Sequence, residues 1–339
     1  MLGVTTGSYA YCTTAQDWCS NLKACARDHN SHGVSVVIPM LNDDKRVKFC
    51  LSSLLDQTLS LDLVEIVLVR NFTSEDDYSN PLDKSIQELL DRFINVQVIS
   101  CEAGNSNASN SGIEAAKFKF LTIIDCDDFV SSRFLELMLH GIDVTDSTNV
   151  VLSPIIDLHG IYNRPTIQML ALRTMQERSV GKRELSPDSN FSDLRLFTTQ
   201  ITAKLFHVHT FCEEKFDVGL TVGMDTELNA RLVRTKNVMS VSSSARGSYY
   251  YRRITFPSMS RPTTKNYKFS VTDRISLIKS LVPDFVERDS LSTGIISSQK
   301  RYIRDYLDAN TEHRAQVTQD FVDAGFDQKF IYELIGIDQ

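Results

Sequence analysis

The sequence predicts an α/β fold in which a mostly parallel central sheet is flanked by helices and followed by a helical C-terminal segment. Three observations lead to this prediction. From residue 34 onward, short apolar runs with the length of buried strands alternate with segments of helical periodicity. The fourth apolar run is followed directly by a group of aspartates. From residue 271 to the last residue, helical periodicity dominates.

The alternating part of the chain contains four predicted strands and three predicted helices. A strand that is buried on both faces of a parallel sheet has a nearly continuous apolar sequence, and residues 34–38, Val-Ser-Val-Val-Ile, are of this kind. Strands and helices that alternate at this interval indicate a parallel sheet with right-handed crossovers. We predict strands at residues 34–38, 64–69, 96–99 and 120–124, and helices at residues 45–57, 82–93 and 107–117.

The composition is that of an ordinary globular protein, with 42% hydrophobic and 23% charged residues in a chain of 339. This length is enough for one large domain or two. The 36 basic and 43 acidic side chains give a formal charge of −7, so we expect no binding of nucleic acid. The seven cysteines are spread out without a Cys-x-x-Cys pair, which favours a reducing compartment over a disulfide framework or a structural zinc site.

No membrane-spanning or targeting segment is evident in the sequence. No apolar run approaches the roughly 18 residues that a membrane helix needs. The N-terminus lacks the basic start and the apolar middle of a signal peptide. We therefore expect a soluble, cytoplasmic protein. Because its substrate could still be carried on a membrane lipid, a peripheral association with the inner face of the membrane remains open.

Asp125, Asp127 and Asp128 are the most informative residues of the chain. They follow the predicted strand at residues 120–124, and ligands of parallel sheets bind beyond the carboxyl ends of the strands. Carboxylates this close together repel one another unless a cation compensates their charge. Their hard oxygen atoms suit Mg²⁺ or Mn²⁺, which usually bridge to a phosphate. The alternative is a loop whose aspartates cap a helix at residues 133–139.

Short sequence motifs occur in a fixed order between residues 34 and 262. The first predicted strand ends in a Pro-x-x-Asn turn, the first predicted helix ends in Ser-x-x-x-Gln-Thr, and an Asn-x-Gly precedes the fourth strand. Each motif alone is weak, but the ordered set resembles the family 2 glycosyltransferases, which are inverting enzymes with a Rossmann-like fold named GT-A. The set consists of residues 34–42, 51–58, 110–112, 125–128, 203–206, 216, 223–228, 250–253 and 258–260.

Composition, helical periodicity and the extent of the resemblance together predict a division of the chain into three parts. Residues 1–32 would be an N-terminal extension, residues 33–264 the GT-A domain, and residues 265–339 a helical C-terminal segment. Within the GT-A domain, residues 33–130 would form the nucleotide-sugar half and residues 131–264 the acceptor half. The C-terminal helices could bind a membrane-associated partner, pair two subunits or cover the sheet. The last of these is favoured by the periodic apolar residues Ile295, Ile303, Tyr306 and Leu307.

The resemblance also implies an activity. The enzyme would move a sugar from a nucleotide-sugar donor, with a UDP-sugar favoured, to a hydroxyl group of a glycan, a lipid-linked carrier or a surface polymer. Mn²⁺ or Mg²⁺ would neutralise the diphosphate as it leaves. Asp127 would bind the metal ion directly, with Asp125 as a second ligand or in contact with the ribose of the donor. The other residues that the resemblance places at the donor are Pro39, Asn42, Asn71, Asn110, Arg252 and Ser258, with Arg253 as a further candidate.

Inversion also needs a base that takes the proton of the acceptor hydroxyl. In the family this base is the Asp of a Glu-Asp pair that opens a helix. Asp225 has this position here, and it is preceded by Met224 instead of a glutamate. The alternative for Asp225 is an acid in the first turn of a helix, where the helix dipole favours a negative charge.

The sequence departs from the family pattern at three places, with four residues in all. The second strand ends in Arg70 and Asn71 where aspartates usually contact the nucleotide base, Ser109 stands where an arginine is frequent, and Met224 replaces a glutamate. These departures motivate a second hypothesis, a catalytically inactive module that binds or scaffolds on the same fold. For Arg70 the two interpretations are a phosphate contact and a solvated surface charge. The sequence specifies neither the sugar, the linkage nor the oligomeric state.

Overall fold

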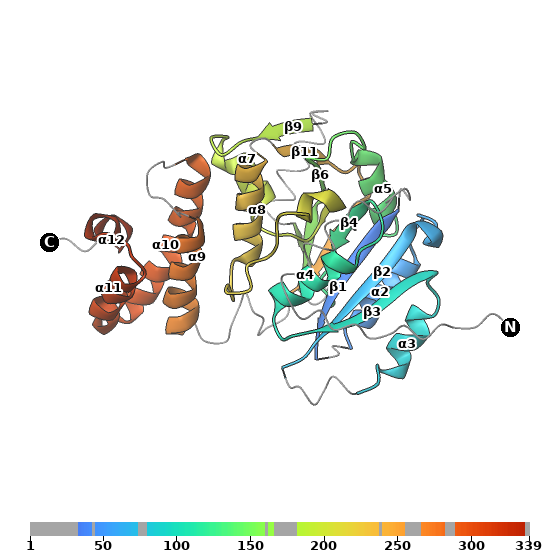
Figure 1. Cartoon of the computed structure of the whole chain (residues 1–339), viewed down its shortest axis with the longest axis horizontal. Helices are drawn as coiled ribbons and strands as arrows, with labels where there is room; N and C mark the ends of the chain where they lie inside the picture. The colour runs from blue at the N-terminus through green and yellow to red at the C-terminus, as the bar shows by residue number, and fades with distance from the viewer. Residues whose placement is uncertain are drawn as a thin grey trace. The chain divides into compact units, whose positions relative to one another are not determined.

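The computed structural model of the protein describes residues 33–42, 45–73, 80–159, 162–165, 182–236, 239–254, 266–281 and 289–335. These residues form two compact units (Figure 1). Unit 1 holds the described part of residues 1–184 together with residues 201–216 and 239–254, and unit 2 holds the described part of residues 185–200, 217–238 and 255–339. The predicted extension at residues 1–32 and the predicted donor residue Ser258 lie outside the described residues.

The central sheet of unit 1 has eight strands in the order β3-β2-β1-β4-β10-β6-β11-β9. β1 pairs in parallel with β2 and β4, and β2 pairs in parallel with β3, so the four predicted strands form one parallel half. β10 runs antiparallel to β4 and β6, a reversal of which the sequence gives no sign. The mostly parallel sheet is therefore confirmed. Its strands are β1 (Val34–Leu41), β2 (Val64–Asn71), β3 (Asn95–Cys101), β4 (Phe120–Ile123), β6 (Asn149–Leu152), β9 (Lys182–Leu185), β10 (Lys204–His207) and β11 (Met239–Ser243).

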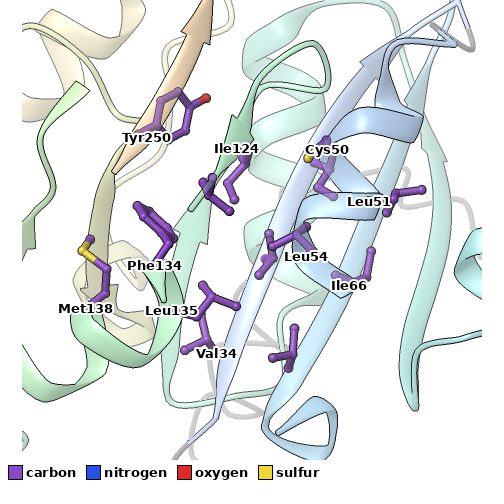
Figure 2. Packing of buried hydrophobic residues seen from close by; sticks show 14 of the residues in the cluster. Val34, Cys50, Leu51, Leu54, Ile66, Ile124, Phe134, Leu135, Met138 and Tyr250 are labelled. Carbon is purple, nitrogen blue, oxygen red and sulfur yellow. The ribbon is translucent and has the colours of Figure 1, made fainter. Parts of the chain in front are cut away.

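Helices cover both faces of the parallel half. α2, α3 and α5 pack on the face that carries Val34 and Ile38, and Figure 2 shows side chains of α2 and α5 on this side. α4 packs on the opposite face, where Gly112 lies against Val37 and Val69. Because both faces are covered, β1 is buried along most of its length, which explains its nearly continuous apolar sequence. The helices are α2 (Val47–Leu55), α3 (Lys84–Leu90), α4 (Asn105–Ala115) and α5 (Phe134–Gly141).

We call residues 125–128 the Asp loop. The Ser-x-x-x-Gln-Thr motif at the end of α2 binds the segment that follows this loop. Gln57 Nε2 donates to the Ser131 carbonyl (2.8 Å), and Gln57 Oε1 accepts the N–H of Leu135 (2.9 Å). The hydroxyl oxygen of Ser53 accepts the N–H of Val130 (3.2 Å). Gln57 thus satisfies a free N–H in the first turn of α5, a role that a cap residue usually has.

A second sheet of four strands has the order β5-β12-β7-β8. β12 is antiparallel to β5 and parallel to β7. β5 directly follows the Asp loop, so the chain enters the second sheet immediately after this loop. β5 is too short to show a period of two, so the sequence does not predict its pairing with β12. The strands are β5 (Phe129–Val130), β7 (Ile155–His159), β8 (Tyr162–Pro165) and β12 (Tyr250–Arg253).

Unit 2 contains the predicted C-terminal helices together with two stretches, residues 185–200 and 217–238, that the resemblance places in the acceptor half. The C-terminal helices have an apolar core of their own, in which Ile278, Ile303 and Phe321 are buried. Among the helices of the described ranges, none is both long and apolar enough to cross a membrane. The helices of unit 2 are α7 (Phe191–Thr198), α8 (Met224–Thr235), α9 (Asp273–Leu281), α10 (Ser290–Ala309), α11 (Arg314–Asp323) and α12 (Gln328–Ile335).

Gly112→Ala is expected to destabilise unit 1, although the same change in an exposed helix is favourable by about 1 kcal/mol. A Cβ at position 112 would lie 2.2 Å from Val37 Cγ1 and 3.0 Å from Val69 Cγ2, so α4 would have to move away from the sheet. Overpacking of this kind costs about 1–3 kcal/mol. Urea unfolding measures the effect, with Gly219→Ala as control, because a Cβ at the exposed Gly219 would meet only Asp217 Oδ1 (3.2 Å), the end of an exposed side chain that can move aside. An unchanged or raised unfolding midpoint for Gly112→Ala would show that α4 does not pack this closely.

Candidate functional site

The Asp loop lies where β4 leaves the central sheet. The N–H of Ile124 still donates to the Val37 carbonyl of β1 (3.0 Å), and the N–H of Asp128 then donates to the Asp125 carbonyl (3.0 Å), which closes the loop as a turn. Asp125 and Asp127 are half-buried, whereas Asp128 is buried. The carboxyl edge of the parallel half therefore carries the loop, in the place where ligands of such sheets bind.

Asp128 ties the Asp loop to β12. Its Oδ2 accepts the hydroxyl of Tyr250 (2.8 Å), and its Oδ1 accepts the backbone N–H of Arg253 (2.8 Å). Burial raises the pKa of the Asp128 carboxyl to about 7. The helix-capping alternative is wrong for these aspartates, because α5 begins only at Phe134 and the side chain that accepts an N–H of its first turn is that of Gln57.

Tyr250 is a site residue whose role the sequence does not reveal. Its fully buried ring packs edge-on against Phe134, with ring centroids 6.4 Å apart (Figure 2). Its hydroxyl accepts the N–H of Asp125 (3.1 Å) while it donates to Asp128. Burial, together with the charge of Asp128, raises the pKa of Tyr250 well above its usual value, so the hydroxyl keeps its proton and can donate. One hydroxyl group thus holds both ends of the Asp loop.

Asp127 contacts an arginine for which the sequence gives no functional signal. Arg46, the residue just before α2, donates from Nη1 to Asp127 Oδ2 (2.9 Å) across 81 positions of the chain. A basic residue before a helix is a common surface feature, so the sequence position of Arg46 alone could not predict its contact with Asp127.

Cys50, in α2, is fully buried. Burial, the nearby Cys126 and the aspartates of the loop raise the pKa of the Cys50 thiol well above its usual value, so it stays uncharged.

The Asp loop can offer two carboxylates to a metal ion, those of Asp125 and Asp127, because Asp128 is bonded to β12. Within the ranges that the structure describes, no group of three His, Cys, Asp or Glu side chains is arranged to hold a metal ion. Mg²⁺ is usually bound through one or two carboxylates together with phosphate oxygens of a substrate. The residues present therefore fit a cation that arrives with a phosphorylated ligand better than a self-contained metal centre.

Asn42 and Asn71 organise the edge where β1 and β2 end. Asn42 has a left-handed φ of 49°, and its N–H donates to the Asn71 carbonyl (2.8 Å). Its Oδ1 accepts the N–H of Thr73 (3.1 Å). The buried side chain of Asn71 accepts the N–H of Gly104, next to the start of α4 (3.1 Å). Pro39 is buried within β1. A role of Pro39, Asn42 or Asn71 in donor binding stays a prediction.

Asn110 fastens α4 to another backbone segment of unit 1. Its Nδ2 donates to the Phe216 carbonyl (3.0 Å), and its Oδ1 accepts the Phe216 N–H (2.9 Å). Gly112, the other defined residue of the Asn-x-Gly motif, allows the close packing of α4 on the sheet. The motif therefore has a structural reason in this fold, and a contact between Asn110 and the donor stays a prediction.

Arg252 and Arg253 are neighbours on β12 with different surroundings. The Arg252 guanidinium is paired with both carboxylate oxygens of Asp157, at 2.7 and 2.9 Å. The Arg253 guanidinium lies over the ring of Phe49 in α2, 4.5 Å from the ring centroid. Its Nη1 is buried and has no hydrogen-bond partner among the residues that the structure describes. Of the two arginines, Arg253 therefore has a side-chain donor that no described residue accepts, while its backbone N–H is bonded to Asp128.

Arg70, at the end of β2, is buried. Its Nη2 donates to the Asn80 carbonyl (3.0 Å), and its guanidinium lies over the Phe72 ring, 4.9 Å from the centroid. The interpretation of Arg70 as a solvated surface charge is therefore wrong. A contact between Arg70 and phosphate stays a prediction.

Asp225 lies in the first turn of α8, in unit 2. The helix begins after Gly223, whose left-handed φ of 74° suits glycine. Asp225 is half-buried, and the preceding Met224 is buried. Glu227, also in the first turn, pairs with Arg231 (2.8 Å). The helix dipole favours a carboxylate at this end of α8, and the role of Asp225 as a base stays a prediction.

Tyr250→Phe is expected to lower the free energy of unfolding by about 1–3 kcal/mol, because buried Asp128 and the Asp125 N–H each lose a partner. Tyr251→Phe is the control, since the Tyr251 ring stacks on Phe129 with centroids 5.0 Å apart and would keep this contact. Urea unfolding followed by circular dichroism compares the two variants. Equal stability of the two would contradict the role of the Tyr250 hydroxyl.

The sequence is similar to those of known glycosyltransferases. The family model described as Glycosyl transferase family 2 matches residues 35–207, just over half of the chain. Poly(ribitol-phosphate) beta-glucosyltransferase of Bacillus spizizenii is 25% identical over 261 residues, which cover 73% of this chain and 37% of that protein. The uncharacterized glycosyltransferase EpsJ of Bacillus subtilis is 36% identical over 104 residues, 30% of this chain and 28% of that protein. The chain thus spans about a third of the length of these relatives.

The fold is similar to that of S. aureus TarS. The structure of TarS residues 1–349 in complex with UDP-GlcNAc matches with a TM-score of 0.60 at 16% identity, over 89% of this chain and 81% of that one. At an identity this low, the match concerns the fold alone. The matched fold agrees with the predicted GT-A architecture. With ordered motifs, a GT-A fold and a family match over half of its length, this chain belongs to glycosyl transferase family 2.

Proposed function

We propose that this chain transfers a sugar from a UDP-sugar, with inversion, to a hydroxyl group of a polyol-phosphate polymer of the cell surface. Membership of the family supports sugar transfer. The complex of TarS with UDP-GlcNAc supports a UDP-sugar as donor, and the name of the B. spizizenii relative supports poly(ribitol phosphate) as the class of acceptor. The observation that carries the proposal is the Asp loop, which holds half-buried carboxylates at the carboxyl edge of the sheet.

The diphosphate of the donor would be held by Arg253 rather than by Arg252. The backbone N–H of Arg253 is hydrogen-bonded to Asp128, which fixes the main chain of Arg253 next to the Asp loop. Stacking on the Phe49 ring restricts the position of its guanidinium. A buried N–H without a partner is unfavourable, and a phosphate oxygen would supply the missing acceptor. Arg252 is already paired in a bidentate manner with Asp157.

In the transfer step, the hydroxyl oxygen of the acceptor forms a bond to the anomeric carbon while the bond from this carbon to the diphosphate breaks. The proton of the hydroxyl passes to Asp225, which is proposed as the base on the strength of the resemblance. The diphosphate leaves with the electron pair of the broken bond, and Arg253 stabilises its charge. A divalent cation, Mn²⁺ or Mg²⁺, bound by Asp127 and Asp125 would add Lewis-acid stabilisation of the same charge.

A catalytically inactive binding module on the same fold is the second candidate. The observation in its favour is that Asn71, Asn110 and Arg252, which the resemblance gives to the donor, make hydrogen bonds within the fold. Fold alone does not decide between the two functions. A module of this kind would have no metal-dependent affinity for a nucleoside diphosphate, so nucleotide binding separates the two candidates.

Calorimetric titration of UDP, GDP, dTDP and CMP, each with and without Mn²⁺, tests the proposed donor. We expect UDP to bind in the presence of Mn²⁺ and Asp127→Asn to remove the Mn²⁺-dependent part of the affinity. Arg253→Gln is expected to weaken UDP binding about 10- to 100-fold, the range for one hydrogen bond to a charged group.

Arg252→Gln is the matched control for this titration, because it removes the same charge from the neighbouring residue of β12. We expect it to lower the stability of the fold through loss of the pair with Asp157, with UDP affinity within about twofold of wild type. The opposite result, weakened binding by Arg252→Gln and normal binding by Arg253→Gln, would reverse the assignment. A folded wild-type protein that binds none of the four nucleotides would favour the binding module.

A further inference from the structure

Arg46 and Asp127 form an ion pair at the Asp loop. Nη1 of Arg46 lies 2.9 Å from Oδ2 of Asp127, and the two side chains are 41% and 25% exposed. Arg46 immediately precedes α2, on the connection that leaves β1, and Asp127 lies on the connection that leaves the neighbouring strand β4. The pair therefore joins two chain segments that leave the sheet next to each other.

A positive charge is needed at the Asp loop, because the loop carries three carboxyl groups within four residues. Carboxylates at this spacing repel one another unless a cation compensates them. A guanidinium cannot lose its proton under physiological conditions, so it provides a permanent charge. The neighbouring Lys45 is paired with Asp83 (3.6 Å), whereas Arg46 is directed to the loop.

We propose that Arg46 is the resident counter-cation of Asp127 and that a divalent cation must displace it. The inference rests on the proposed function, because it concerns the carboxylate that would bind the metal ion. An ion bound by Asp127 at about 2.1 Å and a guanidinium at hydrogen-bond distance from the same carboxylate would place two positive charges within a few ångströms of each other, so the two compete for Asp127. By linkage, Arg46 weakens metal binding by the factor by which the metal weakens the ion pair.

The consequence is an order of loading. In the free chain, Arg46 satisfies Asp127 and keeps the affinity for the bare ion low. A nucleoside diphosphate brings further oxygen ligands for the ion, and its negative oxygens can accept the released guanidinium. The ion therefore binds tightly only together with the nucleotide.

Electron paramagnetic resonance of free Mn²⁺ measures binding of the bare ion to the full chain. Arg46→Met removes the charge, and we expect it to bind Mn²⁺ about three- to tenfold more tightly than wild type, the range for a partly exposed charged contact. Arg46→Lys keeps the charge and should remain closer to wild type. Adding Asp127→Asn to Arg46→Met should remove the gain. Lys48→Met, which removes the same charge elsewhere on α2, should give no gain.

An unchanged or weaker Mn²⁺ affinity of Arg46→Met would overturn the inference, and so would the absence of Mn²⁺ binding by all variants. A purely structural role for Arg46 would lower the melting temperature without raising the Mn²⁺ affinity. If Arg46→Met does not fold, Arg46→Gln repeats the measurement with a second neutral side chain.

Parallel titrations with UDP separate this inference from the proposed function. UDP binding that requires Mn²⁺ and Asp127, without a gain in the Arg46 variants, would overturn the inference and keep the proposed function. A gain in Mn²⁺ affinity without any UDP binding would support the inference and contradict the proposed function.

Discussion

The hydroxyl of Tyr250 makes the contact on which the geometry of the site depends. It accepts the N–H of Asp125 at one end of the Asp loop and donates to Asp128 at the other, and the backbone N–H of Arg253 on the same strand also donates to Asp128, so β12 of the second sheet holds the loop. Burial keeps this hydroxyl protonated, which lets it serve both contacts. Asp128 is thereby a structural residue, while Asp127 is directed to Arg46. The different roles of the three aspartates follow from this arrangement.

Much of the parallel half could be predicted from the sequence, because strands such as Val34–Leu41 and Val64–Asn71 are buried on both faces and therefore have mostly apolar sequences. The second sheet and the reversed β10 could not be predicted in this way. β5 has two residues, too few to show a periodicity, and β10 begins with a lysine and ends with a histidine, so it lacks the mostly apolar sequence by which the equally short β4 is predicted. Their pairing is also long-range, since Val130 of β5 pairs with Tyr250.

The place of the candidate site could be predicted, but the partners of its side chains could not. The ends of the predicted strands put the Asp loop at the carboxyl edge of the sheet. The contacts of Asn110 with Phe216 and of Arg46 with Asp127 span 106 and 81 positions, and no local pattern encodes them. Gln57 and Asn110 belong to motifs that suggest a function, yet their amides bond to backbone groups of the fold. A motif thus marks a residue that matters without saying whether it binds a ligand or holds the chain.

The proposed function requires that the chain itself transfers a sugar and that Asp225 acts as the base. We would measure the release of UDP from UDP-glucose and from UDP-GlcNAc in the presence of poly(ribitol phosphate), for the wild type and for Asp225→Asn. The expected result is transfer by the wild type from one of the two donors. Asp225→Asn should bind UDP normally and transfer the sugar about 10²- to 10⁴-fold more slowly, the usual contribution of a general base. Transfer by Asp225→Asn at close to the wild-type rate would contradict the assignment of the base, and a folded wild type that releases no UDP would contradict the proposed transfer.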